Sequence, residues 1–256
     1  MSEPGSLIRT LSGRQAARNY HSYVINEVGA AIVGGAMAVG SILPGDAEMM
    51  ERFGVSRTVL REALKTLEAK GLVEARAKVG TRVLPQARWN LFDRQVLLWV
   101  LESGPSPAFL DSFGIVRRSL QLEAAGLAAR HREAEHIRLL RYWQTQRQVM
   151  SHQPEPFAMA EFELFRVICE ASANPFIRAA SGLVEFGVAI DIGARLTAGL
   201  APAQGLAPRD ATEHLALMTA LEAGEPQAAR AAMQALLDRA LLDRAAEDQP
   251  PATGAI

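Results

Sequence analysis

The sequence predicts a mainly α fold: an N-terminal unit of three helices and a β-hairpin, followed by an all-α helical bundle of six to seven helices. Two observations carry this prediction. Hydrophobic residues make up 49% of the 256 residues and aromatic residues only 6%, and the abundant alanine favours helices. Beyond residue 105, prolines follow helix-capping residues, as they do where helices begin. The chain is long enough for two modest domains.

The composition divides the chain into five parts. Residues 1–18 are polar and irregular, which predicts a mobile arm. Residues 19–85 form the first predicted domain, and residues 86–105 form a linker that contains its own helix. Residues 106–246 form the predicted helical bundle, and residues 247–256 form a tail.

Charge and cysteine content indicate the protein's setting. Residues 1–85 hold 11 Lys and Arg against 8 Asp and Glu, a net +3, whereas the remainder holds 16 against 20, a net −4. A mildly basic head on an acidic body is consistent with a head that binds nucleic acid. The single cysteine, Cys169, cannot form an internal disulfide, so we expect a cytoplasmic protein.

One uncharged stretch, Val28 to Gly45, is long enough to span a membrane by its length alone. It contains five glycines and Pro44, however, and few large aliphatic side chains. The region before it also lacks the short basic start of a signal peptide. We therefore predict a buried helix end followed by a turn, and no membrane partner.

The pattern of the first domain predicts helix, helix, turn, helix and hairpin. A first helix covers Tyr20 to Val33, and a short second helix covers Asp46 to Phe53. Gly54 makes the turn, and Ser56 caps a third helix that reaches about Lys70.

The predicted hairpin follows at once. Its strands are the β-prone stretches Leu72 to Ala75 and Thr81 to Leu84, and Arg76, Lys78 and Gly80 form its tip.

The helical bundle is predicted from its capping residues. Each helix start pairs a capping residue with proline at the first helical position, or forms a capping box. These starts are Ser106-Pro107, Glu155-Pro156, Asn174-Pro175, Glu225-Pro226, and Asp210 with Glu213. The predicted helices, including the linker helix, cover about 92–102, 107–130, 133–151, 156–172, 175–198, 210–223 and 226–246.

The third helix has one apolar face and one basic face. Its apolar stripe consists of Val59, Leu60, Ala63, Leu64 and Leu67, and the opposite face carries Arg57, Thr58, Arg61 and Lys65. A short helix and a tight turn precede it, which is the layout of a helix-turn-helix, whose second helix places its N-terminal residues against base edges in the major groove. Arginine can grip guanine O6 and N7 there. The alternative interpretation is an ordinary solvated helix face.

A family resemblance extends this interpretation. The run GGAMAVGSILPGDAEMMERFGVSRTVLREALKTLEAKGLVEARAKVGTRV resembles the winged helix-turn-helix of GntR-type transcription regulators. The resemblance implies that the protein contacts DNA through Ser56, Arg57, Thr58 and Arg61, and through Lys78 and Gly80 in the wing. Ala47 departs from the pattern, because relatives can carry a DNA-contacting arginine there.

The rest of the chain is similar to the effector domain of the FadR branch of that family. The similarity rests on VRRSLQLEAAGLAAR, FRVICEASANPF and EHLALMTALEAGEPQAARAAM. It implies a homodimer on palindromic operator DNA that responds to a small organic acid. The linker RWNLFDRQVLLWVLESG resembles those of regulators of sugar-acid catabolism, which implies an aldonate-like effector, such as galactonate.

Most members of the FadR branch hold a divalent metal with one aspartate and three histidines. Placing their D-x-x-F-H run on residues 162–166 puts Phe162 at the aspartate and Arg166 at the first histidine. The second histidine is kept as His214, and the third falls on Leu236. One ligand of four cannot hold a transition metal, so we predict no metal and no other cofactor. Glu161 or Glu163 would face inward only if the helix were rotated from this register.

The candidate effector pocket is Arg117, Arg166 and His214. Arg117 matches an arginine that the FadR branch places against the ligand acid, and the Arg166 guanidinium could bind a carboxylate in place of the metal. Each has a structural alternative. These are a surface arginine for Arg117, an ion pair to an acid such as Glu163 or Glu170 for Arg166, and a core histidine for His214. Asp191 and Arg195, one helical turn apart, line the pocket or pair with each other.

These inferences predict a transcription regulator, in the form of a repressor that a sugar acid releases from its operator. The alternative is a regulator whose effector is lost or is a different organic acid, with a helical domain that serves only dimerisation. An enzyme is not expected, because the sequence shows no set of nucleophile, base and orienting group, and no phosphate-binding loop.

Overall fold

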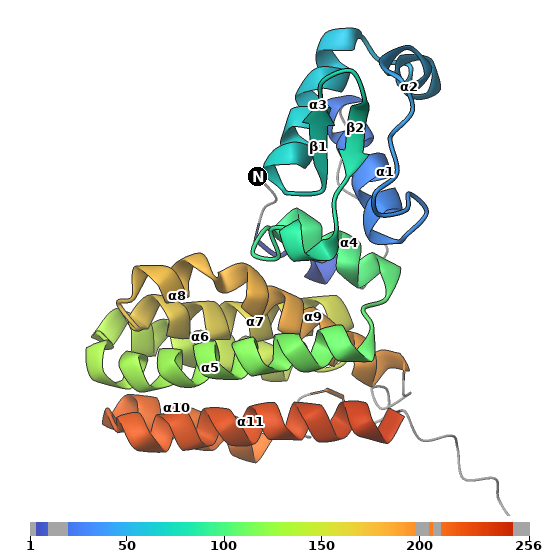
Figure 1. Ribbon diagram of the computed structural model, residues 1–256. Coiled ribbons are helices and arrows are strands. Elements are labelled where there is room, and N and C mark those ends of the chain that lie inside the picture. Colours follow the sequence, from blue (N-terminus) through green and yellow to red (C-terminus); the bar gives the residue numbers. More distant parts are fainter. Residues whose placement is uncertain (1–3, 10–19, 198–204, 207–210, 248–256) are drawn as a thin grey trace, which may run out of the picture. The chain divides into compact units, whose positions relative to one another are not determined.

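The structure, a computed structural model, describes residues 4–9, 20–197, 205–206 and 211–247 (Figure 1). They fall into two compact units. The unit made by the described residues up to Pro105, except residues 4–9, is called the winged unit. Residues 4–9 and the chain from Ser106 onward make the other, called the helical unit.

The winged unit contains the predicted succession of helices and hairpin. Its elements are α1 (Tyr20–Val33), α2 (Asp46–Phe53), α3 (Arg57–Ala69), β1 (Val73–Arg76), β2 (Gly80–Val83), the short 3-10 helix Gln86–Arg88, and α4 (Arg94–Ser103). The strands are antiparallel, with Val73 opposite Val83. These elements confirm the prediction of a helix-turn-helix with a two-stranded wing.

Local chemistry fixes the start and the packing of α3. Gly54 adopts a left-handed conformation with φ 63°, which ends α2 and turns the chain. The Ser56 hydroxyl then accepts a hydrogen bond from the amide of Val59 at 3.4 Å, which caps α3. Leu60 and Leu67 on the apolar face of α3 are fully buried in the core of the unit.

The predicted linker helix is part of the winged unit rather than a separate connector. Trp99 on α4 is only 2% exposed and belongs to the same core cluster as the buried residues of α1. A Cβ atom at Gly29 of α1 would lie 2.4 Å from the Trp99 ring, so glycine is what allows this close approach. The uncharged stretch considered above supplies the end of α1 and the turns after it. Among the described residues, no helix is both long and apolar enough to cross a membrane.

The helical unit packs its helices around one alanine-rich core. Its helices are α5 (Pro107–His131), α6 (Ala134–Val149), α7 (Pro154–Ala171), α8 (Pro175–Ala179), α9 (Ser181–Thr197), α10 (Ala211–Ala223) and α11 (Pro226–Glu247). α11 packs on α5 and α10, and α7 packs on α5, α6 and α9. α7 is the central element, because Phe157, Phe162 and Leu164 on it are fully buried.

Two helix boundaries differ from the prediction. The helix expected over 175–198 is divided into α8 and α9 at Ala180, whose amide bonds back to the carbonyls of Phe176 and Ile177. No proline or charge marks this break in the sequence. α7 begins at Pro154 rather than Pro156, since the amides of the first helical turn need no partner within the helix and both prolines fit there. The expected cap Asp210 lies outside the described residues.

The N-terminal segment differs most from the expectation. Residues 1–18 were expected to form a mobile arm, yet the described residues 4–9 pack into the helical unit. Leu7 and Ile8 are fully buried there, and the Leu7 amide donates a hydrogen bond to Glu185 of α9. The expectation is therefore wrong for this part of the arm. Two apolar side chains in an otherwise polar stretch were too weak a signal to reveal the docking.

Candidate functional site

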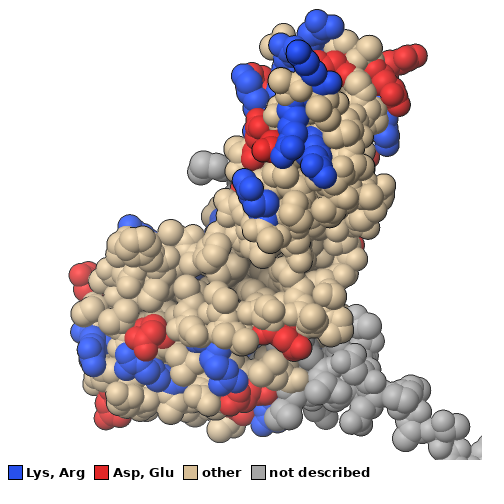
Figure 2. Space-filling model, viewed as in Figure 1, with Lys and Arg blue, Asp and Glu red and all other residues tan. Residues whose placement is uncertain are grey.

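The basic face predicted for α3 is open to solvent. Ser56, Arg57, Thr58 and Arg61 are all exposed at the N-terminal end of the helix. Arg61 has a side-chain exposure of 65% and lies 3.8 Å from the Asp46 carboxylate, too loosely paired in water to be held there. Figure 2 shows Lys and Arg side chains gathered on the part of the molecule that carries α3 and the hairpin.

The hairpin adds basic groups from the wing. Lys78 and Gly80 are exposed at its tip, and both have positive φ values, 64° and 113°. Sequence reasoning missed Arg82, an exposed residue on β2 whose Nε donates a hydrogen bond to the carbonyl of Gly40 at 3.2 Å. The only signal for it was its place two residues after Gly80 in a predicted wing.

This arrangement can dock a duplex. The capped start of α3 presents backbone amides that can bind phosphate, and arginines that can bind base edges or phosphates. The wing presents further cations. The predicted contact residues on this surface are exposed to solvent.

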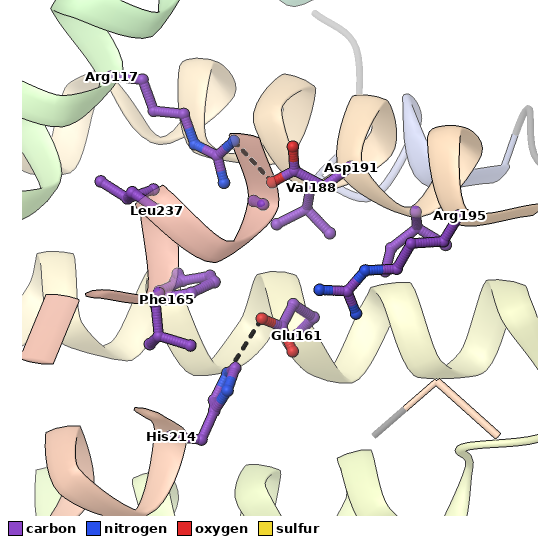
Figure 3. A pocket seen from close by; sticks show the side chains of 11 residues that line it. Arg117, Glu161, Phe165, Val188, Asp191, Arg195, His214 and Leu237 are labelled. Atoms are coloured by element: carbon purple, nitrogen blue, oxygen red, sulfur yellow. Dashed lines mark hydrogen bonds and ion pairs between the residues drawn. The ribbon is translucent and has the colours of Figure 1, made fainter. Parts of the chain in front are cut away.

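A pocket lies in the core of the helical unit (Figure 3). Its polar lining residues come from four different helices, which makes it a junction of the bundle. The lining residues are Arg117, Glu161, Phe165, Val188, Asp191, Ile192, Arg195, His214, Leu236, Leu237 and Ala240. The space not filled by protein atoms is about 360 Å³, including the part open to solvent. The enclosed cavity itself is about 20 Å³, room for about one water molecule, so the lining side chains nearly fill it.

Arg117 and Asp191 form the first charged pair of the pocket. Arg117 on α5 donates from Nη1 to Asp191 Oδ2 on α9 at 2.7 Å, and both residues are buried. The Arg117 Nε also donates to the side-chain oxygen of Gln121 at 2.7 Å. Gly187 makes room for the guanidinium, since a Cβ there would lie 2.6 Å from Nε. The arginine is therefore held with one face toward the pocket.

Glu161 and His214 form the second polar pair of the pocket. His214 Nε2 on α10 lies 3.1 Å from Glu161 Oε1 on α7. The other carboxylate oxygen of Glu161 accepts from Arg147, which is fully buried and stacks over the Phe157 ring with its guanidinium carbon 4.9 Å from the ring centre. Glu161 and Arg147 were not among the predicted site residues. Buried charges need partners, and each of these groups supplies one to the next.

Arg195 completes the polar lining. Figure 3 shows its guanidinium directed into the space between Asp191 and Glu161. Its Nη1 lies 3.5 Å from the carbonyl oxygen of Leu206. Asp191 and Arg195 thus both line the pocket, and the carboxylate of Asp191 pairs with Arg117.

The structure places Arg166 outside the pocket. Its guanidinium pairs with Glu163 at 2.7 Å and with Glu170, both on its own helix α7. The inward positions of α7 are instead Glu161 and Phe165, one turn apart. The D-x-x-F-H run was therefore placed one residue too late, and the pocket assignment of Arg166 is wrong. Of the three predicted pocket residues, the structure brings together Arg117 and His214.

Placing the D-x-x-F-H run one residue earlier also changes which residues stand at the expected metal-ligand positions. Phe165 and Leu236 now occupy the places of two expected histidines, and both line the pocket with apolar side chains. Glu161 and His214 provide one carboxylate and one imidazole. In the described part of the chain, no group of three or more His, Cys, Asp or Glu side chains is placed to hold a metal ion.

Comparison with known proteins agrees with this division into two units. The family model of the bacterial regulatory proteins of the gntR family matches residues 22–83, and the FCD domain model matches residues 115–239. An uncharacterised HTH-type transcriptional regulator of Escherichia coli, YieP, is 37% identical over 177 residues, which cover 68% of this chain and 77% of YieP. The chain belongs to the GntR family. Its FCD domain places it in the FadR subfamily.

Other relatives of this GntR regulator are more distant. The galactonate operon transcriptional repressor of Escherichia coli is 28% identical over 155 residues, which cover 60% of this chain and 68% of the repressor. The solved structure of McbR/YncC from Escherichia coli superposes with a TM-score of 0.53 at 15% identity, covering 91% of this chain and all of that one. It shows the same fold.

Family membership settles the general activity. A GntR regulator with an FCD domain is a DNA-binding transcription regulator; the helix-turn-helix implies DNA binding, and the FCD effector domain implies binding of a small ligand. This confirms the expectation of a regulator and the expectation that the chain is not an enzyme.

Proposed function

We propose that this GntR regulator is a homodimeric repressor, and that a small hydroxylated carboxylic acid of the sugar-acid type releases it from its operator. The Arg117–Asp191 pair is the observation that carries the proposal. A guanidinium that already holds a buried carboxylate at 2.7 Å can hold that of an effector in the same geometry.

The rest of the pocket supports a ligand with several hydroxyl groups. Glu161 and His214 can accept or donate hydrogen bonds, and Arg195 offers further donors. Leu236 and Leu237 cover one side of the space with apolar groups. The enclosed cavity is about 20 Å³, so an entering acid would have to displace the lining side chains, which favours a small acid over a long acyl chain. The similarity to the galactonate operon repressor points the same way.

In this mechanism the effector acid is held by protein side chains and not by a metal ion. Arg117 and Arg195 would supply the positive charge that a metal ion otherwise brings. An entering carboxylate would compete with Asp191 for Arg117 and so disturb α9 relative to α5. A ligand that binds the disturbed arrangement better shifts the population of the bundle toward it.

On DNA, we propose that Ser56, Arg57, Thr58 and Arg61 contact the major groove, and that Lys78 and Gly80 approach the backbone or minor groove. Two such heads in a dimer would read two half-sites one helical turn apart. Their exposure supports this role.

A second candidate function is a regulator without an effector. The internal pairing of Arg117 with Asp191 and of His214 with Glu161 favours it, because each of these groups already has a partner inside the bundle. In that case the helical unit would serve only dimerisation.

One titration separates the two candidates. Labelled DNA from the protein's own upstream region is titrated with chelator-treated protein, with and without a panel of sugar acids, and fluorescence anisotropy reports binding. Release by one acid, lost in the double variant Arg117→Met with Asp191→Leu, which keeps no unpaired buried charge, and kept in Arg166→Met, supports the effector-controlled repressor. Specific binding that no acid changes supports the second candidate. Failure to prefer that DNA over a scrambled duplex contradicts both at this operator.

A further inference from the structure

One face of α5 is uncharged and open to solvent. Ile115 is 71% exposed and Val116 is 45% exposed, and the two lie side by side on this helix. The residues one turn away from them in both directions are small. Together they form what we call the Ile115 face, whose members are all exposed: Ala108, Ser112, Ile115, Val116 and Ser119. Figure 1 shows α5 lying across the near side of the helical unit. Single exposed hydrophobic residues are normal on a protein surface, but a contiguous uncharged face is typical of a surface that another element covers.

The two serines of this face use their hydroxyl protons within α5. The Ser112 hydroxyl donates a hydrogen bond to the carbonyl of Ala108 at 2.9 Å, and the Ser119 hydroxyl donates to the carbonyl of Ile115 at 3.0 Å. A buried hydroxyl is costly only when it lacks a hydrogen-bond partner. The Ile115 face can therefore be covered by an apolar surface with little loss of hydrogen bonding.

Gly114 lies next to this face, and packing within the described residues does not explain it. A glycine inside a helix weakens that helix relative to alanine. At Gly126 of the same helix a Cβ would lie 2.4 Å from the Arg230 guanidinium, so close packing explains that glycine. At Gly114 a Cβ would have no neighbour within 4 Å among the described residues. A close approach by a second molecule would give this glycine the same kind of role.

The spacing of the face makes it complementary to itself. Residues i, i+3, i+4 and i+7 of a helix surround a hole that receives a side chain of a facing helix. Ser112, Ile115, Val116 and Ser119 have this spacing, and the two outer corners of the hole are small. If two antiparallel copies of α5 are related by a twofold axis near Ile115, the Ile115 side chain of each copy fits into this hole in the other.

The charged residues beside the face fit the same arrangement. Asp111 precedes the centre of the face by about one turn, and Arg118 follows it by about one turn. In antiparallel copies, Asp111 of each would therefore lie near Arg118 of the other, and the twofold axis creates this contact twice. Arg118 already donates to Asp238 of α11, and a guanidinium has further donors for a second carboxylate.

We propose that two copies of this chain pair through the Ile115 face, with α5 of one copy antiparallel to α5 of the other. The pairing rests on the homodimer of the proposed function and specifies its interface. A closed twofold pair uses the same surface on both copies, and a self-complementary face provides that surface. Arg117, on the buried side of the same helix, lines the pocket, so an effector that shifts α5 would also act on the partner.

Opposite charges at position 115 test the pairing in the full-length protein. Ile115→Glu and Ile115→Lys should each raise the dimer dissociation constant at least about a hundredfold, because the twofold axis places like charges against each other. An equimolar mixture of the two variants should dimerise again, because each charge then faces its opposite. Leu215→Glu, at a 67% exposed position of α10, is the matched control and should leave the dissociation constant unchanged. Sedimentation equilibrium measures the association, and circular dichroism checks that each variant is folded.

Gly114→Gln is an independent variant. Glutamine is a better helix former than glycine, so the variant should keep its helix content. A side chain at a close helix crossing should nevertheless weaken the dimer by about tenfold or more, because the two helices are forced apart. An unchanged dissociation constant would contradict the close approach at Gly114.

The outcomes separate this interface from the proposed function. A dimeric parent whose Ile115→Glu and Ile115→Lys variants also dimerise alone overturns the interface, while the proposed homodimer stands. Charged variants that dissociate and stay apart when mixed overturn the twofold pairing of residue 115, and equal dissociation of Leu215→Glu shows that the loss is not specific to α5. A parent that is monomeric at every concentration overturns both the interface and the homodimer, while anisotropy still judges DNA binding and its release by an acid.

Discussion

Arg117 and Asp191 join α5 to α9 across the pocket through a buried ion pair of 2.7 Å. The residue best placed to recognise an effector acid is therefore also a structural tie of the bundle. Any test of its role in signalling has to separate the two effects.

Arg117→Met should destabilise the helical unit strongly. It removes the cation that faces the buried Asp191 carboxylate, and breaking such a pair on one side costs about 3–5 kcal/mol in the free energy of unfolding. Arg117→Met with Asp191→Leu should recover most of that loss, because both charges are gone. Arg166→Met, which breaks partly exposed pairs on α7, should cost less than about 1 kcal/mol. Urea denaturation measures all three, and a double variant as unstable as the single one would contradict the explanation.

Arg57→Ala and Arg61→Ala should each weaken operator binding by about 1–3 kcal/mol if they make bidentate contacts to guanine. The loss should be confined to the operator and be small on unrelated duplexes. Arg88→Ala is the matched control, because Arg88 is an exposed arginine of the same unit on its short 3-10 helix. Fluorescence anisotropy at fixed salt measures the three variants. An equal loss of affinity on all DNA sequences would show that Arg57 and Arg61 contact phosphates and not bases.

Lys78→Asn should remove a wing charge without disturbing the wing. Lys78 has a φ of 64°, a left-handed conformation that asparagine tolerates better than lysine. We expect unchanged or slightly raised stability, together with weaker binding to all duplexes and a salt dependence lower by about one counterion. Gly80→Ala is the complementary change, since φ is 113° and a Cβ would lie 3.0 Å from Ile42. Gly80→Ala should therefore destabilise the wing. If Lys78→Asn leaves the salt dependence of DNA binding unchanged, Lys78 makes no phosphate contact.

Phe165→His combined with Leu236→His should create a metal site. In the corrected register, the two new imidazoles would join Glu161 and His214 in the pocket, giving the four ligands that a transition metal requires. Titration calorimetry with Zn²⁺, and a rise in the unfolding temperature that EDTA reverses, would detect the site. Arg166→His combined with Leu236→His follows the original register and is the control. Equal zinc affinity in both variants would disprove the one-residue correction.

The Cys169 thiol should stay protonated and inert in the folded protein. Burial raises its pKa from 9.0 to about 12. The unfolded chain releases this proton near pH 9 and the folded chain keeps it, so stability is lost as the pH rises between 9 and about 12. Cys169→Ala should show a shallower fall of unfolding free energy over that range. Rapid labelling of native protein by a thiol reagent at pH 8 would contradict the burial.

Helices whose ends are marked by capping residues, glycine or proline could be predicted from the sequence. Ser56, Gly54 and the prolines at helix starts have local causes, and the helices they mark appear in the structure at or near the expected residues. The break at Ala180 was not expected, because Ser181 and Gly182 after it are weaker signals than a proline and Asn174-Pro175 predicts a single helix start.

The pocket was predictable only in part, for a geometric reason. A one-residue shift turns a helix by about 100°, so placing the metal run on residues 162–166 aimed Arg166 inward and Glu161 away. The fully buried Phe162 belongs to the apolar core side of α7. Arg147 was missed because a buried arginine that stabilises a carboxylate from another helix has no sequence pattern of its own.

The docked N-terminal segment also affects how the protein is prepared. An affinity tag fused close before Gly5 would begin next to a residue that already sits tightly against Met159. Such a tag would compete with the burial of Leu7 and Ile8. DNA affinities measured on N-terminally tagged protein would then describe an altered molecule. Purification through the other end of the chain, or removal of the tag by a protease, preserves the native docking.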